Sequence, residues 1–504
     1  MRDMKVGPMI LSLNSPRFVK KKNAKKRKEP IEAVLMEDGG ADKKKKKAAA
    51  TEAMRRLSQF LILPQGVDLL LESIPNIEVK NAIWRTTAAT RLNGPSGLSD
   101  SENQDDKEAM QAHNQLAAGL SISTYPFLSE SPAGGQKVQA GSPNCDFFTC
   151  SLFTGGVVAC VTDGCGWGAR SQNASRTANQ TFADYVERYL PSVADFQQAA
   201  LLLMRAVQEA HDKIVEGAKR AWEVGTTTLC GGVLFQVAED QVQEFGAPYA
   251  FLSVNIGDCK AYYCTQRTSG GETKRPGGGS KDQLTIPRAS SSGASAIASS
   301  SAASSPTPPP TVASSSPPLH SSSGGISSDS SRSDQIAPRL RWNVSDITTG
   351  NRASSDAKLT GGHLGPKSGP NETLLLPDLG NFTIHITPCS HGDMFVLVSD
   401  GVHDNLDPET LNIEPQAVGL DYGAWLDVPL DERTRAKDIY RADLVAQHID
   451  NTRSPSEIAV NMLKWVRKVT ENKRLFMENN TGKEEPAELP GKMDHTTVVV
   501  FSVE

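Results

Sequence analysis

The sequence predicts an α+β layered domain that is interrupted by a long segment without a core. Short apolar runs bounded by glycine and polar residues alternate with stretches of helical periodicity. Another strand-like run, residues 495–503, ends the chain. Residues 266–338 are rich in serine and proline and hold too few large apolar side chains to bury a core. Strands before and after helices favour a layered α+β arrangement.

Composition divides the 504 residues into five segments, and the 38% hydrophobic content fits one sizeable domain with disordered additions. The predicted segments are a basic disordered arm at 1–54, a partly ordered extension at 55–115, the first part of the domain at 116–265, a disordered Ser/Pro-rich insertion at 266–338, and the second part of the domain at 339–504.

The individual elements follow from the pattern of apolar residues. In the first half we expect strands at 146–153 and 156–163, joined by a glycine-containing turn, then helices within 176–190 and 193–222, then strands within 225–237, 247–258 and 260–265. In the second half we expect strands at 382–388 and 393–400, helices near 435–450 and 455–470, and a final strand at 495–503.

Bulk properties narrow the compartment and the partners. A net charge of −5 gives no reason to expect a nucleic-acid partner, and no apolar run approaches the ~18 residues of a membrane span. The start of the chain lacks a secretory cleavage site, which favours an intracellular protein. The eight cysteines form no CxxC pair, and several of them, such as Cys160, Cys230 and Cys264, lie in apolar runs and are expected to be core thiols. The lysine-rich arm, which includes Lys43–Lys47, is either a solvated tail or a nuclear-import signal, so both cytoplasm and nucleus stay open.

Carboxylates stand at the ends of several predicted strands. Asp163 and Asp400 each end an apolar run and precede a glycine, Asp494 stands directly before the last strand, and Asp146 opens the strand that pairs with the one ending at Asp163. A single Asp-Gly is usually a tight turn. Several of them, each joined to an apolar strand, favour hard divalent cations, which prefer oxygen ligands. Two such cations about 4 Å apart activate a water and hold a phosphoryl group.

Five stretches, in this order, resemble motifs of the metal-dependent type 2C (PPM-type) protein serine/threonine phosphatases. The resemblance runs from about Asp146 to the C-terminus and is interrupted by the Ser-rich insertion. The stretches are VVACVTDGCGWG, GTTTLCGGVLF, SVNIGDCKAYYC, GDMFVLVSDGVHDNL and MDHTTVVVFSV.

The resemblance implies an antiparallel β-sandwich flanked by helices in four layers, αββα, with two Mn²⁺ or Mg²⁺ ions at one end. It implies that Asp163 bridges the two ions, that Gly164 offers its carbonyl oxygen to one of them, and that Asp400 and Asp494 complete the ligands of the other, with Asp146 close by. The implied reaction on a phosphoprotein substrate is direct attack of a metal-activated water on phosphoserine or phosphothreonine. The Gly257-Asp258 pair matches a structural turn of the family, without a ligand role.

Helper residues of the family are altered here. Cys165 replaces the histidine that follows the first Asp-Gly, Cys145 replaces a glutamate, Gly141 stands where an arginine often holds the phosphate, and His495 replaces an asparagine. Three functions therefore stay open. The first is a divergent phosphatase, favoured by the retained aspartates, and the second is a catalytically impaired module that binds phosphoproteins or a regulatory partner. A third is an interaction hub that uses the basic arm and the Ser-rich segment.

Residues 346–365 form a glycine-containing stretch whose place in the chain suggests the loop that lies over the active site in the family. An ordinary surface loop is the equal alternative.

Overall fold

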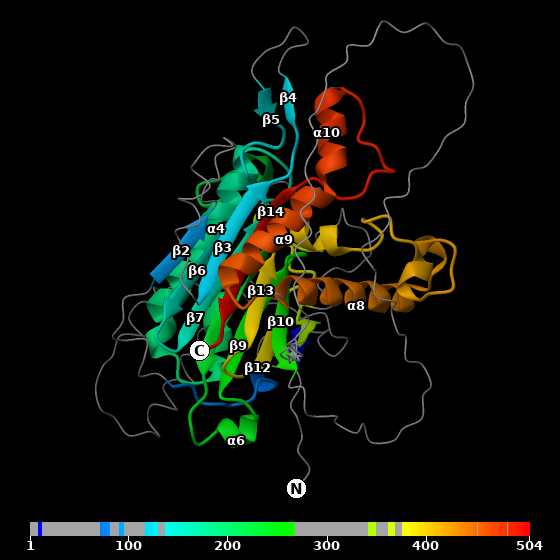
Figure 1. Ribbon diagram of the computed structural model, residues 1–504. Helices are drawn as coiled ribbons and strands as arrows, with labels where there is room; N and C mark the ends of the chain where they lie inside the picture. Colours follow the sequence, from blue (N-terminus) through cyan, green and yellow to red (C-terminus); the bar gives the residue numbers. More distant parts are fainter. Residues whose placement is uncertain are drawn as a thin grey trace, which may run out of the picture.

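Two antiparallel β-sheets pack face to face, and helices cover the outer face of each (Figure 1). The computed structural model describes residues 9–12, 71–80, 90–94, 116–129, 137–267, 341–348, 361–367, 375–450, 452–480 and 482–504. This four-layer arrangement confirms the fold class that the sequence predicts.

The first sheet has seven strands, and every neighbouring pair is antiparallel. In spatial order they are β1 (Met9–Ser12), β12 (Thr383–Cys389), β9 (Tyr249–Ile256), β8 (Leu229–Gln236), β7 (Gly156–Asp163), β6 (Asp146–Phe153) and β2 (Thr90–Gly94).

The second sheet has five antiparallel strands, and a separate two-stranded ribbon stands beyond its end. The order is β11 (Arg341–Asp346), β10 (Lys260–Arg267), β13 (Met394–Val398), β14 (His495–Ser502) and β3 (Ala117–Ser123). The ribbon consists of β4 (Phe127–Ser129) and β5 (Lys137–Gln139), at the top of Figure 1.

Helices α4 (Ala169–Tyr189) and α5 (Phe196–Val215) pack on the first sheet, and α8 (Leu430–Ile449) and α9 (Pro455–Val469) pack on the second. Shorter helices are α6 (Val242–Phe245), α7 (Asp400–His403) and α10 (Glu471–Asn479). Single 3₁₀ turns lie at Leu190–Ser192, Ala221–Glu223, Asp404–Leu406, Pro415–Val418 and Trp425–Asp427.

Local chemistry sets where the long helices begin. Asp195 caps α5, because its carboxylate accepts a hydrogen bond from the backbone N–H of Gln198 at 2.8 Å. Ser454 caps α9 in the same way, and Pro455 occupies the first helical position, where its missing N–H costs nothing. Both helices then bury apolar residues at three- and four-residue spacing.

The interior between the sheets is built from alternate residues of facing strands. Phe251 of β9 packs against Phe395 of β13 and Phe501 of β14, with ring centroids 4.6 Å and 5.3 Å away, and Phe395 stacks on Phe501 at 5.2 Å. All three rings are fully buried. Because side chains alternate along a strand, this layer also fixes which residues at the strand ends point between the sheets.

The predicted strands lie within a few residues of their expected positions, whereas α4 begins at Ala169 instead of near 176 and α5 ends at Val215 instead of near 222. The sequence pattern missed β3, β11 and α10. The run of β3, AAGLSIS, combines small and polar residues, and its burial comes from packing in the second sheet. Within the arm expected to be disordered, Met9–Ser12 pairs with β12 as β1. Lys43–Lys47 and all of 268–338 lie outside the described residues.

Described parts of the 55–115 extension join the domain. Residues 71–80 contribute Leu71, Ile74, Ile77 and Val79 to the apolar cluster under α5, and β2 forms one edge of the first sheet. None of the described helices is both long enough and apolar enough to cross a bilayer.

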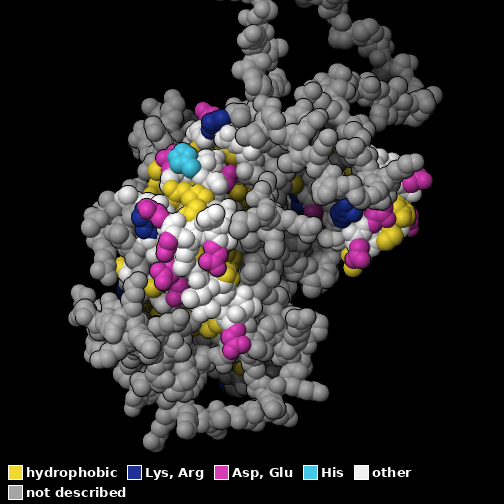
Figure 2. Space-filling view, turned by 90° about the horizontal axis from the view of Figure 1, so that it is seen from below, with side chains coloured by type: hydrophobic (Ala, Val, Ile, Leu, Met, Phe, Trp, Pro, Cys, Tyr) yellow, Lys and Arg dark blue, Asp and Glu magenta, His cyan; other side chains and the backbone are white. Residues whose placement is uncertain are grey.

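Figure 2 shows the lower end of the molecule, on the side of α6. There the described surface mixes acidic, basic and apolar side chains, with the acidic ones prevailing. The ends of β6, β7, β13 and β14 discussed below lie at the opposite end of the sheets.

Replacing Phe251 by alanine should lower the free energy of unfolding by about 3–5 kcal/mol, because it leaves a cavity between the two sheets. Urea unfolding followed by circular dichroism measures this. Leu426→Ala, at a side chain that is 83% exposed, is the control and should change stability by less than about 0.5 kcal/mol. A loss below about 1 kcal/mol at Phe251 would contradict the packing described here.

Candidate functional site

Four aspartates from the two sheets meet at the upper end of the sandwich. Asp146 opens β6 and lies directly opposite Asp163, the last residue of β7. Asp400 follows β13, and Asp494 immediately precedes β14, the strand next to β13. The two pairs are close across the sandwich, since Asp400 and Asp494 are near enough to help raise the pKa of Asp163. The structure thus brings together all four predicted site residues, while their role as ligands stays a prediction.

The strand period explains why the first pair faces inward. Phe148, two residues after Asp146, and Val161, two residues before Asp163, both belong to the cluster between the sheets. Side chains two residues apart share a face, so both carboxylates point between the sheets. Like charges directly opposite each other destabilise an antiparallel pair of strands. The ionised pair therefore lowers the stability of the fold unless other contacts or a bound cation compensate it.

The glycine after each strand-end aspartate is required by close backbone packing. A Cβ atom on Gly164 would lie 2.5 Å from the carbonyl oxygen of Ser171, and one on Gly401 would lie 1.9 Å from the carbonyl oxygen of His495. The two Asp-Gly pairs therefore serve the assembly of the site whatever it binds.

Burial and mutual repulsion raise the pKa of three of the four carboxyl groups. Burial raises the pKa of Asp146 to about 7, helped by Asp494 and Asp400 and partly offset by the hydroxyl groups of Ser399 and Thr497. Burial and the neighbouring carboxylates raise the pKa of Asp163 well above its usual range, and that of Asp494 rises to about 6 for the same reasons.

Lys492 lies among the carboxylates, and sequence reasoning missed it. Its ammonium group is 2.5 Å from Asp400 Oδ2, 2.9 Å from Asp494 Oδ2 and 3.1 Å from Asp404 Oδ2. Burial acts to raise the pKa of Asp400, but Lys492 outweighs it and lowers that pKa overall. In the sequence, Lys492 is recognisable only as a lysine two residues before Asp494. That spacing does not show that its side chain reaches Asp400 and Asp404.

Two further aspartates contribute negative charge. Asp404, in the turn after α7, lies beside Lys492, and its carboxylate is 3.2 Å from His403 Nδ1. Asp258, expected to be a structural turn residue, is buried and near enough to help raise the pKa of Asp163.

Asp494 is held in place by a chain of hydrogen bonds. The Tyr125 hydroxyl group donates to Asp494 Oδ1 at 3.1 Å, and Trp167 Nε1 donates to that hydroxyl oxygen at 2.8 Å. The backbone N–H of His495 donates to the same Oδ1 at 2.9 Å. Burial and Asp494 raise the pKa of Tyr125, so the phenol stays protonated and keeps donating. Trp167 thus links the start of α4 to the opposite sheet.

The residues that replace family helpers are electrically neutral at pH 7. Burial raises the pKa of the Cys165 thiol to about 12 and that of Cys145 to about 11. Burial lowers the pKa of His495 to about 4, so the imidazole ring is neutral at pH 7. Gly141 adopts a φ of 73°, and its backbone packs against the Tyr125 ring.

A cavity of about 470 Å³ begins at Cys165 and Gly166, just after Asp163 and Gly164 in the chain, and none of the four aspartates lines it. Its walls carry one cationic side chain, Arg170, and two exposed indole rings, Trp167 and Trp222, which are 65% and 48% exposed. Arg170 donates a hydrogen bond to the carbonyl oxygen of Trp222. Of the 346–365 stretch, the described residues 361–365 lie at this side of the molecule, where Leu364 pairs with Thr227.

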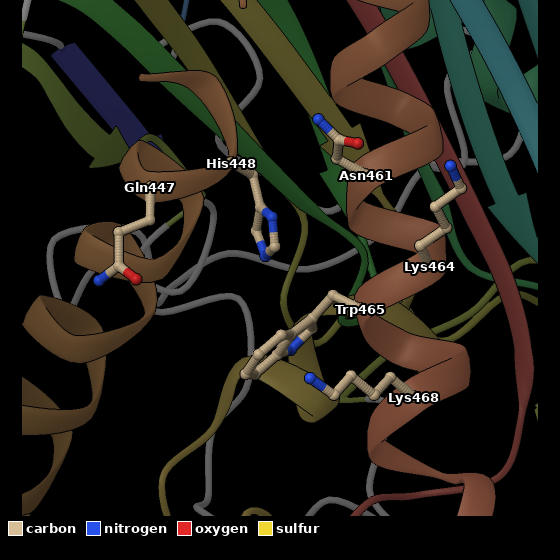
Figure 3. A pocket seen from close by; sticks show the side chains of 6 residues that line it. All are labelled: Gln447, His448, Asn461, Lys464, Trp465 and Lys468. Carbon is tan, nitrogen blue, oxygen red and sulfur yellow. The ribbon is translucent and has the colours of Figure 1, made fainter. Parts of the chain in front are cut away.

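A second cavity, of about 360 Å³, lies between α8 and α9. Figure 3 shows His448 of α8 and Trp465 of α9 turned toward each other, with ring centroids 5.7 Å apart, while Lys464 and Lys468 come from α9. Burial lowers the pKa of His448 to about 4, so the imidazole is neutral. This cavity is separate from the aspartates, and its residues were not singled out by the sequence.

The aspartate cluster fits a divalent cation by the chemistry of its donors. Both carboxylate oxygens of Asp146 are buried, with no hydrogen-bond partner among the described residues, and its strand partner Asp163 repels it. Carboxylate oxygens are the ligands that Mn²⁺ and Mg²⁺ prefer. Within the part of the chain that the structure describes, however, no three Asp, Glu, His or Cys side chains already stand as a metal-ligand group.

No family model and no curated protein matches the sequence. Solved structures with a similar arrangement include the PPM Ser-Thr phosphatase MsPP from Mycobacterium smegmatis in complex with cacodylate, at 15% identity and a TM-score of 0.32, covering 78% of this chain and 100% of that one. The photosystem II phosphatase PBCP follows at 13% identity and 0.34, covering 77% and 98%. RsbX in complex with magnesium has 11% identity and 0.28, covering 78% and 98%. These superpositions are loose, so the functional argument below rests on the site of this chain.

The metal-free protein should lose stability as the pH rises from about 4 to about 7. Asp146 and Asp494 have raised pKa values in the folded state, so the folded protein binds more protons than the unfolded chain in this window. Asp146→Asn should therefore raise the free energy of unfolding at pH 7.5 by about 2–4 kcal/mol. Urea unfolding in EDTA at pH 4.5 and 7.5 measures both effects. Equal stability of Asp146→Asn and wild type at pH 7.5 would contradict the repulsion described here.

Proposed function

We propose that this chain, by its fold and motif order a divergent member of the PPM-type phosphatase family, hydrolyses phosphoserine and phosphothreonine in proteins with the help of divalent cations. The observation that carries the proposal is the convergence of Asp146, Asp163, Asp400 and Asp494, with a cavity of about 470 Å³ that begins at Cys165, two residues after Asp163. Buried carboxylates that repel one another are costly, and perturbed groups of this kind beside a cleft are typical of functional sites.

The residues that would hold a cation are Asp146, Asp163 and the carbonyl oxygen of Gly164, with Asp400 and Asp494 on the side of the second sheet. Bound Mn²⁺ or Mg²⁺ lowers the pKa of water and offsets the charge of a phosphoryl group. The chain itself supplies rigid strand ends, which keep the carboxylates in place, and the Tyr125 hydrogen bond, which orients Asp494.

The cavity that begins at Cys165 supports a role in substrate binding. Gly141 cannot hold a phosphate, but the Arg170 guanidinium group lines this cavity and is a strong partner for phosphate oxygens. The exposed rings of Trp167 and Trp222 offer apolar surface to the peptide on either side of the phosphorylated residue.

Protonation of the leaving group is the weak point of the site. The Cys165 thiol, with a pKa near 12, keeps its proton at pH 7 and gives it up less readily than an imidazolium group does. We therefore expect turnover that is slow and that favours substrates with good leaving groups.

The second candidate is a phosphatase-like module that binds phosphoproteins without hydrolysis. Lys492 favours it, because this ammonium group already compensates the charge of Asp400 and Asp494. The neutral Cys165 and His495 point in the same direction.

Asp163→Asn and Asp400→Asn should each lower Mn²⁺-dependent hydrolysis of a phosphothreonine peptide by a hundredfold or more, on the order of the loss when one transition-state contact is removed. Asp240→Asn, at an exposed aspartate, is the matched control and should leave the rate unchanged. Turnover is measured by phosphate release from purified full-length protein with millimolar Mn²⁺ and with EDTA.

Wild-type protein that binds the phosphopeptide in calorimetry but releases no phosphate with Mn²⁺ would reject the enzyme and support the binding module. Metal-dependent release that survives in both asparagine variants would place the activity elsewhere.

Arg170→Ala should raise KM for the phosphopeptide about tenfold and leave kcat within about a factor of two, since the guanidinium group binds substrate and does not contact the reacting water. Arg176→Ala, at an exposed arginine of the same helix, should change neither constant. With p-nitrophenyl phosphate, which lacks a peptide, the loss of the Trp167 ring in Trp167→Ala should matter less than with the peptide. An unchanged KM in Arg170→Ala would remove this arginine from the substrate site.

A further inference from the structure

We infer that the Lys492 ammonium group takes the place of one of the two cations, so that the site holds a single divalent ion at the Asp146–Asp163 end. This inference rests on the proposed function for the existence of a metal site, but it concerns the number of ions and their position. The sequence resemblance implied two.

The contacts of Lys492 are those of a small cation. Its nitrogen lies within 3.1 Å of one carboxylate oxygen from each of Asp400, Asp404 and Asp494, of which the first two lie on the continuous turn after β13 and the third precedes β14. Hard divalent ions likewise prefer several carboxylate oxygens, but these three carboxylates are already paired with an ammonium group and do not stand as a metal-ligand group among the described residues. The side chain is 29% exposed, so the ammonium group closes the solvent side of this trio.

The backbone of Lys492 is fixed independently of the carboxylates. The buried side chain of Asn405 accepts a hydrogen bond from the Lys492 N–H at 2.9 Å and donates to the Lys492 carbonyl oxygen at 2.8 Å. The same amide group donates to the carbonyl oxygen of Gly401 at 2.7 Å, which ties the lysine to the segment that carries Asp400. Trp465 Nε1 in turn donates to the Asn405 carbonyl oxygen at 3.1 Å. Lys492 is therefore a built part of the site.

The other half of the cluster has no ion pair with a cation among the described residues, although the hydroxyl groups of Ser399 and Thr497 partly stabilise the Asp146 carboxylate. The Asp146 oxygens are buried without a hydrogen-bond partner among the described residues, and Asp163 lies opposite on the next strand. This pair, with the Gly164 carbonyl beside it, is left as the place for one divalent ion.

The test is the number of Mn²⁺ ions bound per chain, which does not depend on turnover. Full-length protein stripped with EDTA is titrated with Mn²⁺ by calorimetry and by equilibrium dialysis at pH 7.5, and electron paramagnetic resonance reports whether bound ions are magnetically coupled. We expect one uncoupled Mn²⁺ in the wild type. In Lys492→Met we expect two ions with a coupled signal.

Lys437→Met is the matched control, because Lys437 is a buried lysine that likewise contacts two carboxylates, Asp407 at 3.2 Å and Glu409 at 2.5 Å. It should bind one Mn²⁺, like the wild type. Lys492→Gln, which is uncharged but polar, is the second variant if Lys492→Met does not fold, as judged by circular dichroism, and should also bind two.

Two ions or none in the wild type would overturn the inference, as would a folded Lys492→Met or Lys492→Gln that still binds one. The number of bound ions and the release of phosphate are measured separately, so this inference and the proposed function can fail independently. One Mn²⁺ per wild-type chain without phosphate release rejects the phosphatase and leaves this inference standing, whereas two ions with metal-dependent release keep the phosphatase and reject it.

Discussion

The repulsion between carboxylates packed at one end of a β-sandwich is the constraint on which the rest of the site depends. Asp146 and Asp163 face each other across neighbouring strands, and Asp400 and Asp494 approach from the opposite sheet. In a buried position, each charge makes the next one harder to ionise. A fold that keeps such a cluster needs positive charge in the middle of it, either from the solvent or from the chain.

Here the chain supplies part of that charge. Lys492 contacts three carboxylates, and it lowers the pKa of Asp400 overall, while at Asp494, which it also contacts, burial and Asp400 outweigh it and the pKa stays raised. The site is thus divided into a half on the second sheet that pairs with this lysine and a half on the first sheet that has no ion pair with a cation among the described residues. This division bears on the residues that differ from the family pattern. A site that contains a lysine ammonium group has a different electrostatic field from a site that binds two divalent ions from solution.

The residues next to the aspartates are better suited to binding a substrate than to transferring a proton. Cys165 and His495 are both neutral at pH 7, so neither adds charge near the aspartates. The cavity with Arg170 and two exposed tryptophans lies on the side of Cys165. On this fold, the residues around the aspartates therefore decide between slow hydrolysis of a phosphoprotein and binding without hydrolysis.

The sequence by itself determined the local elements and half of the cluster. Two apolar runs joined by a short glycine turn predict an antiparallel pair, and their lengths alone place Asp146 opposite Asp163. Apolar spacing likewise predicted α4, α5, α8 and α9, while β3 and β1 were missed because their pairing partners lie hundreds of residues away in the chain. Only the tertiary structure decided that Asp400 and Asp494 meet this pair, that Lys492 lies among them, and that Cys165 and His495 are neutral. These properties depend on distances and burial between side chains of separate strands, which no local pattern encodes.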